Sequence, residues 1–304
     1  MQYRRTMIYP NDGYFQDVSG DGLKPKNSHR IHIILFLSTV LTTTVIGALM
    51  ADRNPFTSLT GFASGFPFSL TLLGILGVHE FAHYFAARSW NINVTLPYFI
   101  PLPLPTIGTL GAVIRMKSSL PNRKALVDVG SSGPIAGFIV ALIASAVGLS
   151  MSEISTVSGP ELEYSILLGE SLIFKFISFL VIGDLPAEAV ISLHPVAFAG
   201  WVGLFVTALN LIPVGQLDGG HILFAFSPRV HELLRRIRVP LLILMGILFW
   251  EGWYVWAVLS LLFGRSHPYP NRMEYSIGPS RTAMGIISLL IFILCMTPIP
   301  VLVG

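Results

Sequence analysis

The residue types best suited to catalysis occur together in one short stretch, His79-Glu80-Phe81-Ala82-His83. On a helix, residues four positions apart share a face, so His79 and His83 can bind one metal ion. Glu80 follows the first histidine, where its carboxylate can accept a proton from a metal-bound water molecule. Ionisable groups at membrane depth are costly and usually functional, so this stretch, which closes a long apolar run, predicts a metal site with a general base. The alternative is that the three polar side chains only satisfy one another inside a helical bundle.

A second stretch, Asn210–Gly220, contains the candidate for a third ligand. A catalytic zinc ion needs three protein ligands and an open position for water. Pro213 and Gly215 break the preceding apolar helix, so the chain can turn and present the Asp218 carboxylate to a neighbouring helix. We therefore expect Asp218 to complete the ligand set, although a carboxylate in an ordinary D-G-G turn is the alternative. Zinc is inferred from ligand type, since two histidines and an aspartate would also hold cobalt or manganese.

The elements that must position these residues are unusually apolar. Of 304 residues, 53% are hydrophobic and only 12% are charged, and the mean hydropathy is +0.70. A soluble protein has roughly 25% charged residues, so the composition argues against a soluble enzyme. The basic residues lie in short clusters between apolar runs, which argues against a nucleic-acid partner. The single cysteine, Cys295, excludes an intrachain disulfide.

The chain is therefore expected to be an all-α polytopic membrane protein with a six-helix transmembrane bundle. Apolar runs long enough to cross a bilayer are Ile31–Met50, Gly65–Ala87, Ala125–Ser150, Pro195–Ile212, Val239–Phe263 and Thr282–Val303. Residues 1–30 are expected to form a polar cytoplasmic tail, and residues 31–304 a single membrane domain. The weaker run Leu162–Ile182 is interrupted by charges, which favours an amphipathic segment at the outer interface.

Lysine and arginine in short loops predict the orientation of these spans. Basic residues precede the first span, lie between the second and third, and follow the fourth, so the N-terminus and the metal site are expected towards the cytoplasmic side. Three later arginines do not fit this orientation if Val239–Phe263 is a single crossing, because they then lie on the outer side of the membrane. They are Arg265, Arg272 and Arg281. The alternative is a broken or re-entrant pair of helices around Glu251-Gly252.

Residues 91–117 have a different pattern from the apolar runs. They contain four closely spaced prolines, and the segment Gly108–Ile114 has the composition of a short strand. Proline is tolerated on an edge strand but not in a helix interior. We expect a small hairpin or strand-loop that enters the membrane under cover of the helices, since irregular backbone cannot face lipid.

Together, H-E-x-x-H and N-x-x-P-x-x-x-L-D-G on separate apolar helices resemble the site-2 protease family of intramembrane zinc metalloproteases, peptidase family M50. Further similarity lies in Leu96–Ile100, Gly108–Ile114, Asn122–Leu126, Gly133–Gly137 and His194–Gly220. The chain is similar to the branch without a PDZ domain that occurs in archaea, cyanobacteria and plastids. The resemblance extends from about the second span to the end of the chain and does not include the polar tail.

The resemblance implies a zinc ion held by His79, His83 and Asp218, with Glu80 activating water. It implies hydrolysis of peptide bonds within or near transmembrane segments of membrane proteins, as in regulated intramembrane proteolysis. It also implies that Thr106–Ile114 pairs with an unwound substrate. The protein would then be an integral, multi-pass component of a cell membrane, or of a plastid or thylakoid-type membrane.

Three neighbouring residues have open interpretations. Asn210 belongs to the second motif and is the candidate donor to the oxyanion, or else a buried amide that caps the break at Pro213. His221 could hydrogen-bond Asp218 or have no role. Small residues such as Gly133 are expected to permit close helix packing.

Two other functions fit parts of this pattern. A membrane zincin that cleaves prenylated proteins would use a glutamate as its third ligand, so Asp218 counts against it. A metal-binding transporter or receptor would have no need of Glu80. Substitution of that carboxylate therefore separates proteolysis from metal transport. The sequence leaves the oligomeric state open.

Overall fold

The computed structural model describes residues 28–103, 107–156, 166–186, 189–263 and 276–303 of the chain. Residues 1–27 of the expected tail, Thr106, Arg265 and Arg272 lie outside the described residues. The longer helices are α1 (Ser28–Met50), α3 (Phe66–Ser89), α4 (Arg123–Ser150), α6 (Pro195–Asn210), α8 (Pro228–Leu248) and α10 (Pro279–Cys295). The shorter ones are α2 (Leu59–Ala63), α5 (Leu172–Ile182), α7 (Asp218–Phe226) and α9 (Gly252–Phe263). The described chain is mostly helical, as expected.

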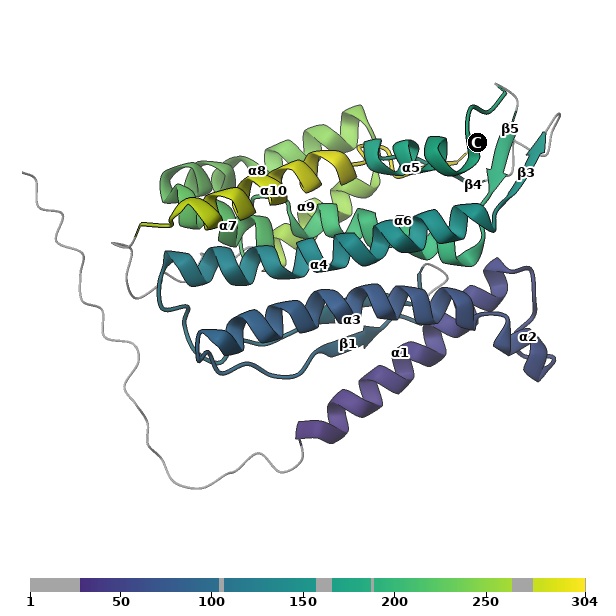
Figure 1. Cartoon of the computed structure of the whole chain (residues 1–304), viewed down its shortest axis with the longest axis horizontal. Coiled ribbons are helices and arrows are strands. Elements are labelled where there is room, and N and C mark those ends of the chain that lie inside the picture. Colours follow the sequence, from purple (N-terminus) through teal and green to yellow (C-terminus); the bar gives the residue numbers. More distant parts are fainter. Residues whose placement is uncertain (1–27, 104–106, 157–165, 187–188, 264–275, 304) are drawn as a thin grey trace, which may run out of the picture.

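The helices pack around α4, which contacts α3, α5, α6, α7 and α10. Figure 1 shows α3 and α4 side by side, with α1 crossing the far side of α3 and with α8, α9 and α10 beyond α4. Helices α4 and α6 approach each other closely, because a Cβ atom on Gly148 or Gly200 would collide with the facing helix. These small residues let the two backbones approach within lipid, where close packing drives helix association.

Within the described part of the chain, three helices are long and apolar enough to cross a membrane, namely His29–Met50, Leu59–Ser89 and Arg123–Ser150. They coincide with the first three expected spans. Shorter apolar helices occur at Leu172–Ile182, Pro195–Asn210, Gly252–Leu261 and Pro279–Cys295. The expected count of six spans is therefore not confirmed.

The fifth expected span, Val239–Phe263, consists of two helices rather than one. Helix α8 ends at Leu248, and α9 begins at Gly252. The two run antiparallel, because an Arg238 guanidinium N–H donates to the Ser260 carbonyl at 3.2 Å while Gly246 lies against the ring of Tyr254. The chain therefore turns back at Phe249–Glu251, as the re-entrant alternative requires.

The last expected span is also shorter than its apolar run. Helix α10 ends at Cys295, before the prolines at positions 298 and 300, which cannot continue a helix. The chain ends in a strand, β6 (Val301–Val303), paired with β4 (Ile166–Leu168). A second pair joins β3 (Glu153–Thr156) to β5 (Ala189–Ser192). These strands, α5 and the C-terminus gather at one end of the molecule (Figure 1).

The proline-rich segment contains the expected strands. The antiparallel pair β1 (Tyr98–Pro101) and β2 (Thr109–Val113) has a register irregularity between Phe99 and Pro101. Helix α1 holds β1: His32 Nδ1 lies 3.0 Å from the Pro97 carbonyl. The turn is also fixed to this helix, because the Thr42 hydroxyl donates to the Gly108 carbonyl at 2.7 Å. The hairpin is thus anchored to α1 through both side chains.

Candidate metal centre

Helix α3 positions the two histidines and the glutamate of the first motif. His79, Glu80 and His83 are 4%, 7% and 5% exposed, so all three are buried among the helices. Because the two histidines are one helical turn apart, their rings point to the same side, with centroids 4.8 Å apart. The first motif therefore forms the expected paired site on a buried helix face.

Asp218 is the first residue of α7 and reaches the same place from another element. Gly215, at φ +63°, turns the backbone between α6 and α7. A Cβ atom on Gly219 would collide with the Leu211 carbonyl, and one on Gly220 would lie 2.5 Å from the Gly215 carbonyl. The two glycines after Asp218 therefore allow the turn to fold directly over the first turn of α7.

The three candidate ligand atoms converge. His79 Nε2 lies 3.3 Å and His83 Nε2 lies 3.2 Å from Asp218 Oδ2, and the two nitrogens are 3.1 Å apart. Two ligands about 2.0–2.1 Å from a tetrahedral zinc ion are roughly 3.3–3.4 Å apart. Donor types and spacing therefore fit a zinc ion with three protein ligands and a remaining coordination position. Among the described residues, these three form the only such group of histidines, cysteines and carboxylates.

The orientation of His83 is fixed by helix α4. Its Nδ1 lies 2.7 Å from the Val129 carbonyl, which can only accept, so Nδ1 carries the proton and Nε2 is left to bind a metal. Two α4 glycines cover the rings: a Cβ atom on Gly133 would collide with His83 Nε2, and one on Gly137 would lie 3.0 Å from His79 Nδ1. The expected close packing at Gly133 is thus packing against the candidate metal ligands.

Glu80 and Asn210 flank this ligand group without belonging to it. The backbone of Ile114, the residue after β2, lies close to the Glu80 carboxylate. Asn210 is the last residue of α6, and its Nδ2 atom lies 3.4 Å from His79 Nε2. Its amide therefore lies beside the candidate metal position, as a donor to an oxyanion would. His221 is buried in α7, where its Cβ faces Gly130 of α4.

Sequence reasoning missed several residues that support the centre. Arg123 and His231 contact the ends of the segment that carries Asp218. The i,i+4 spacing of Gly133 and Gly137 is a recognisable signal of close packing, but nothing in the spacing shows that the facing groups are imidazoles. Val129 acts through its backbone carbonyl, so its side-chain type gives no signal.

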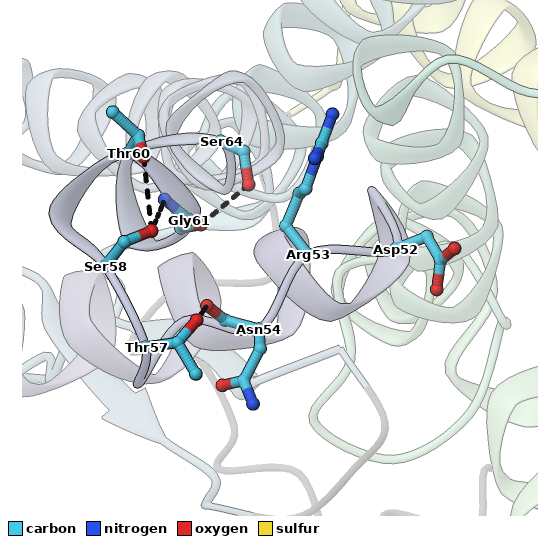
Figure 2. Close-up of a pocket in the computed structure, with 8 residues that line it drawn as sticks. All are labelled: Asp52, Arg53, Asn54, Thr57, Ser58, Thr60, Gly61 and Ser64. Carbon is cyan, nitrogen blue, oxygen red and sulfur yellow. Dashed lines mark hydrogen bonds between the residues drawn. The ribbon is translucent and has the colours of Figure 1, made fainter.

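A polar pocket of about 580 Å³ lies elsewhere, at the turn between α1 and α3. Figure 2 shows that its hydroxyl groups bond within the same turn, as Ser58 does to the Gly61 N–H at 3.0 Å. The side chains of Asp52 and Arg53 point in different directions. From Phe66 to His83, α3 spans roughly 25 Å at 1.5 Å per residue. This pocket is therefore separate from the metal centre.

Comparison with known proteins agrees with this geometry. The family model described as Peptidase family M50 matches residues 67–249, so the chain belongs to this peptidase family. The matched region includes His79, Glu80, His83 and Asp218.

Several relatives carry names that specify zinc, among them the following three. The chain is 32% identical over 260 residues to "Probable zinc metalloprotease EGY2, chloroplastic" of Arabidopsis thaliana, covering 84% of this chain and 46% of the relative. It is 32% identical to the Arabidopsis thaliana EGY1 protein of the same description, covering 77% of this chain and 43% of the relative. It is 29% identical to EGY1 of Oryza sativa subsp. japonica, covering 93% and 53%. The chain thus spans about half the length of these relatives. No solved structure matches it.

Proposed function

We propose that the chain is an intramembrane zinc metalloprotease that hydrolyses peptide bonds within or near the transmembrane segments of other membrane proteins. The observation that carries this proposal is the convergence of His79, His83 and Asp218 from two separate helices, with Glu80 beside them and outside the ligand set. Family membership and the zinc metalloprotease names of the relatives support it.

Each polar group of the centre has a role in this chemistry. A bound zinc ion supplies a Lewis acid that polarises the scissile carbonyl and lowers the pKa of water to about 7. The Glu80 carboxylate accepts the proton of the attacking water and returns it to the leaving amine. The Asn210 amide donates a hydrogen bond to the oxyanion that develops on the carbonyl oxygen. The backbone of Ile114 lies beside the Glu80 carboxylate, at the end of β2.

The β1–β2 hairpin is the proposed place for an unwound substrate. Among the described residues, β1 is the only strand that pairs with β2; α1 packs mainly against β1, and α3 contacts β2. An extended peptide can therefore add to the other edge of β2 through main-chain hydrogen bonds. Because Ile114 immediately follows this strand and its backbone lies near the Glu80 carboxylate, the added peptide would pass close to the general base.

The bilayer supplies both the surroundings and the substrates in this proposal. The apolar helices fit an integral membrane protein. The N-terminus and the metal centre are proposed to lie towards the cytoplasmic side of a cell membrane, or the equivalent side of a plastid-type membrane. The basic loop residues support that orientation.

The experiment compares the detergent-purified protein with its Glu80→Gln variant, measuring zinc content and cleavage of a panel of transmembrane peptides. We expect equal zinc in both proteins, with cleavage at least about 100-fold slower in the variant because the general base is lost. Cleavage by the parent should stop on chelation. Glu251→Gln, which removes a carboxylate from the exposed turn between α8 and α9, is the matched control and should cleave normally.

Each contrary result identifies a different error. A wild-type protein without zinc would overturn the ligand assignment. Zinc bound by both proteins, no cleavage by either and metal transport unaffected by Glu80→Gln would favour the transporter alternative. Cleavage of prenylated peptides alone would favour the prenyl-protein zincin.

A further inference from the structure

The third metal ligand depends on its supporting helix more than the other two do. His79 and His83 share one turn of α3, so the helix itself fixes their relative position. Asp218 begins a separate helix of nine residues that follows an irregular turn. Its carboxylate stays 3.2–3.3 Å from the two imidazole nitrogens only while this short helix holds its place. The groups that hold α7 in place therefore determine where the Asp218 carboxylate lies in the metal site.

Arg123 anchors the C-terminal end of α7. Its Nε donates to the Ala225 carbonyl at 2.6 Å, and its Nη2 donates to the Phe226 carbonyl at 3.3 Å. The last carbonyls of a helix have no hydrogen-bond partner within the helix and carry partial negative charge. A guanidinium supplies both the missing hydrogen-bond donors and a compensating positive charge. Arg123 is itself the first residue of α4, the helix whose Val129 carbonyl orients His83. One helix thus supports the histidine and the helix of the aspartate.

His231 anchors the turn before the N-terminal end of α7. It is only 2% exposed, and its Nε2 lies 3.2 Å from the Gly215 carbonyl. A carbonyl only accepts hydrogen bonds, so Nε2 is the donor. Burial lowers the pKa of His231 below its usual value, which favours the neutral ring. The ring also meets Phe224 edge-on at 5.3 Å.

The Gly215 carbonyl connects this anchor to the ligand. The carbonyl oxygen receives the His231 N–H and also lies close to Gly220, where a Cβ atom would be only 2.5 Å away. The turn is thus held between the imidazole of α8 and the first turn of α7. A displacement of the turn would move that helical turn, and Asp218 with it.

We propose that Arg123 and His231 are positioning residues for the third metal ligand, holding the two ends of the segment that presents Asp218. The inference rests on the proposed zinc site and adds to it. Neither side chain touches the ligand atoms. Each acts through the backbone of the segment, so its removal weakens metal binding without removing a ligand.

The test measures zinc affinity of the full chain in detergent by competition with a chelator of known affinity. His231→Leu and Arg123→Gln remove the two anchors, and each is expected to raise the Kd for zinc by about tenfold or more. His231→Gln can keep an N–H donor of similar reach, so it should recover most of the affinity. Asp218→Asn, which changes the ligand itself, is the reference for full loss.

A second readout separates positioning from a general loss of structure. The visible bands of bound Co²⁺ report ligand geometry, and they should change in His231→Leu and Arg123→Gln. Arg235→Gln is the matched control, since Arg235 lies on the same helix as His231 and pairs with the partly exposed Glu232 at 2.6 Å. This control should keep both the affinity and the bands. Thermal unfolding of the metal-free proteins identifies any variant that does not fold. If one of the two anchor variants does not fold, the result for the other variant decides the test.

The outcomes distinguish this inference from the proposed function. Wild-type zinc affinity and unchanged cobalt bands in folded His231→Leu and Arg123→Gln would overturn the positioning role and leave the zinc site intact. Failure of the wild-type protein to bind zinc would overturn the proposed site itself. Weakened binding in both variants, with recovery in His231→Gln, would support the positioning role.

Discussion

At the scale of single residues, the metal centre depends on missing side chains as well as on ligands. Gly133 leaves room for His83 Nε2, and Gly137 does so for His79. Glycine costs roughly 0.5–1 kcal/mol relative to alanine in a helix, so its presence at both positions needs a local reason. The reason is that α4 must approach the imidazoles closely enough for the Val129 carbonyl to bind His83 Nδ1.

Replacing Gly133 by alanine is therefore expected to remove the metal. The added Cβ would occupy the position of His83 Nε2, so the imidazole must leave its ligand geometry. We expect zinc affinity to fall at least about tenfold, as when a supporting contact of a ligand is lost, with cleavage falling in parallel. Zinc content after dialysis and peptide cleavage are the measurements.

Gly74→Ala is the matched control for this substitution. Gly74 is a glycine of α3 with nothing within 4 Å of an added Cβ. Alanine there should keep zinc and leave stability equal or higher, because alanine favours the helix. Full zinc affinity in Gly133→Ala would show that the imidazole does not occupy the described position.

At the scale of elements, the β1–β2 hairpin and the metal centre can be separated experimentally. The Thr42 hydroxyl of α1 donates to the Gly108 carbonyl at the hairpin turn. Thr42→Val removes this donor while keeping the shape of the side chain. A net hydrogen bond contributes about 1 kcal/mol, so we expect roughly fivefold lower kcat/KM for a transmembrane peptide, with zinc affinity unchanged.

Thr42→Ser keeps the hydroxyl and serves as the control, with near wild-type kcat/KM expected. A parallel loss of zinc in Thr42→Val would mean that the hairpin supports the ligands rather than the substrate. Unchanged kinetics in Thr42→Val would argue against a role of the anchored hairpin in substrate binding.

The antiparallel pair α8 and α9 accounts for an inconsistency in the charge pattern. With a single crossing at Val239–Phe263, Arg281 would lie on the opposite side from the basic start of α8. Because α9 returns along α8, the start of α10 comes back to the side of Arg238. There Arg281 pairs with Asp128, near the start of α4, at 2.7 Å. All the described basic loop clusters then agree with one orientation.

Cysteine labelling of sealed vesicles tests this return. The native cysteine is buried, and after Cys295→Ser single cysteines can replace the exposed residues Arg236, Ser280 and Glu251. An impermeant maleimide should label positions 236 and 280 from the same side of the membrane and position 251 from the other. Labelling of positions 236 and 280 from opposite sides, with position 251 unlabelled, would instead support a single crossing.

At the scale of the whole molecule, an ion pair joins the last helix to the core helix. Arg281 of α10 donates two hydrogen bonds to the Asp128 carboxylate of α4 at 2.9 and 2.7 Å. Trp90, at the end of α3, donates to the same carboxylate at 3.1 Å, and the guanidinium lies 5.8 Å from its ring. Three helices that are distant in sequence therefore meet at one carboxylate.

Breaking this ion pair should lower the stability of the fold without changing the candidate ligand atoms. The two side chains are 27% and 20% exposed, so the loss lies between that of a surface pair and that of a buried pair, about 1–3 kcal/mol. Arg281→Gln should therefore lower the unfolding midpoint in detergent by several degrees. Asp128→Asn combined with Arg281→Gln should cost less than the sum of the single changes, since either one breaks the pair. If the decrease in midpoint of the double variant equals the sum of the two single decreases, the two residues do not stabilise the protein as a pair.

The sequence by itself determined the chemistry of this protein and the character of its helices. Ligand types and their spacing are local properties, because residues four apart on any helix share a face. His79, Glu80 and His83 could therefore be assigned together, and the apolar composition predicted a helical membrane protein. The prolines after α10 and the break at Glu251-Gly252 were also visible, although the apolar runs alone overestimated the length of these helices.

Only the tertiary structure decided which distant groups meet. The contact of Gly133 with His83, the two anchors of α7 and the antiparallel return of α9 each join residues from different elements. Within a membrane, hydrophobicity is nearly uniform along the helix faces, so the apolar pattern does not specify which face packs against which helix. Close backbone approach at small residues and a few hydrogen bonds supply that information, and they exist only once the helices have packed.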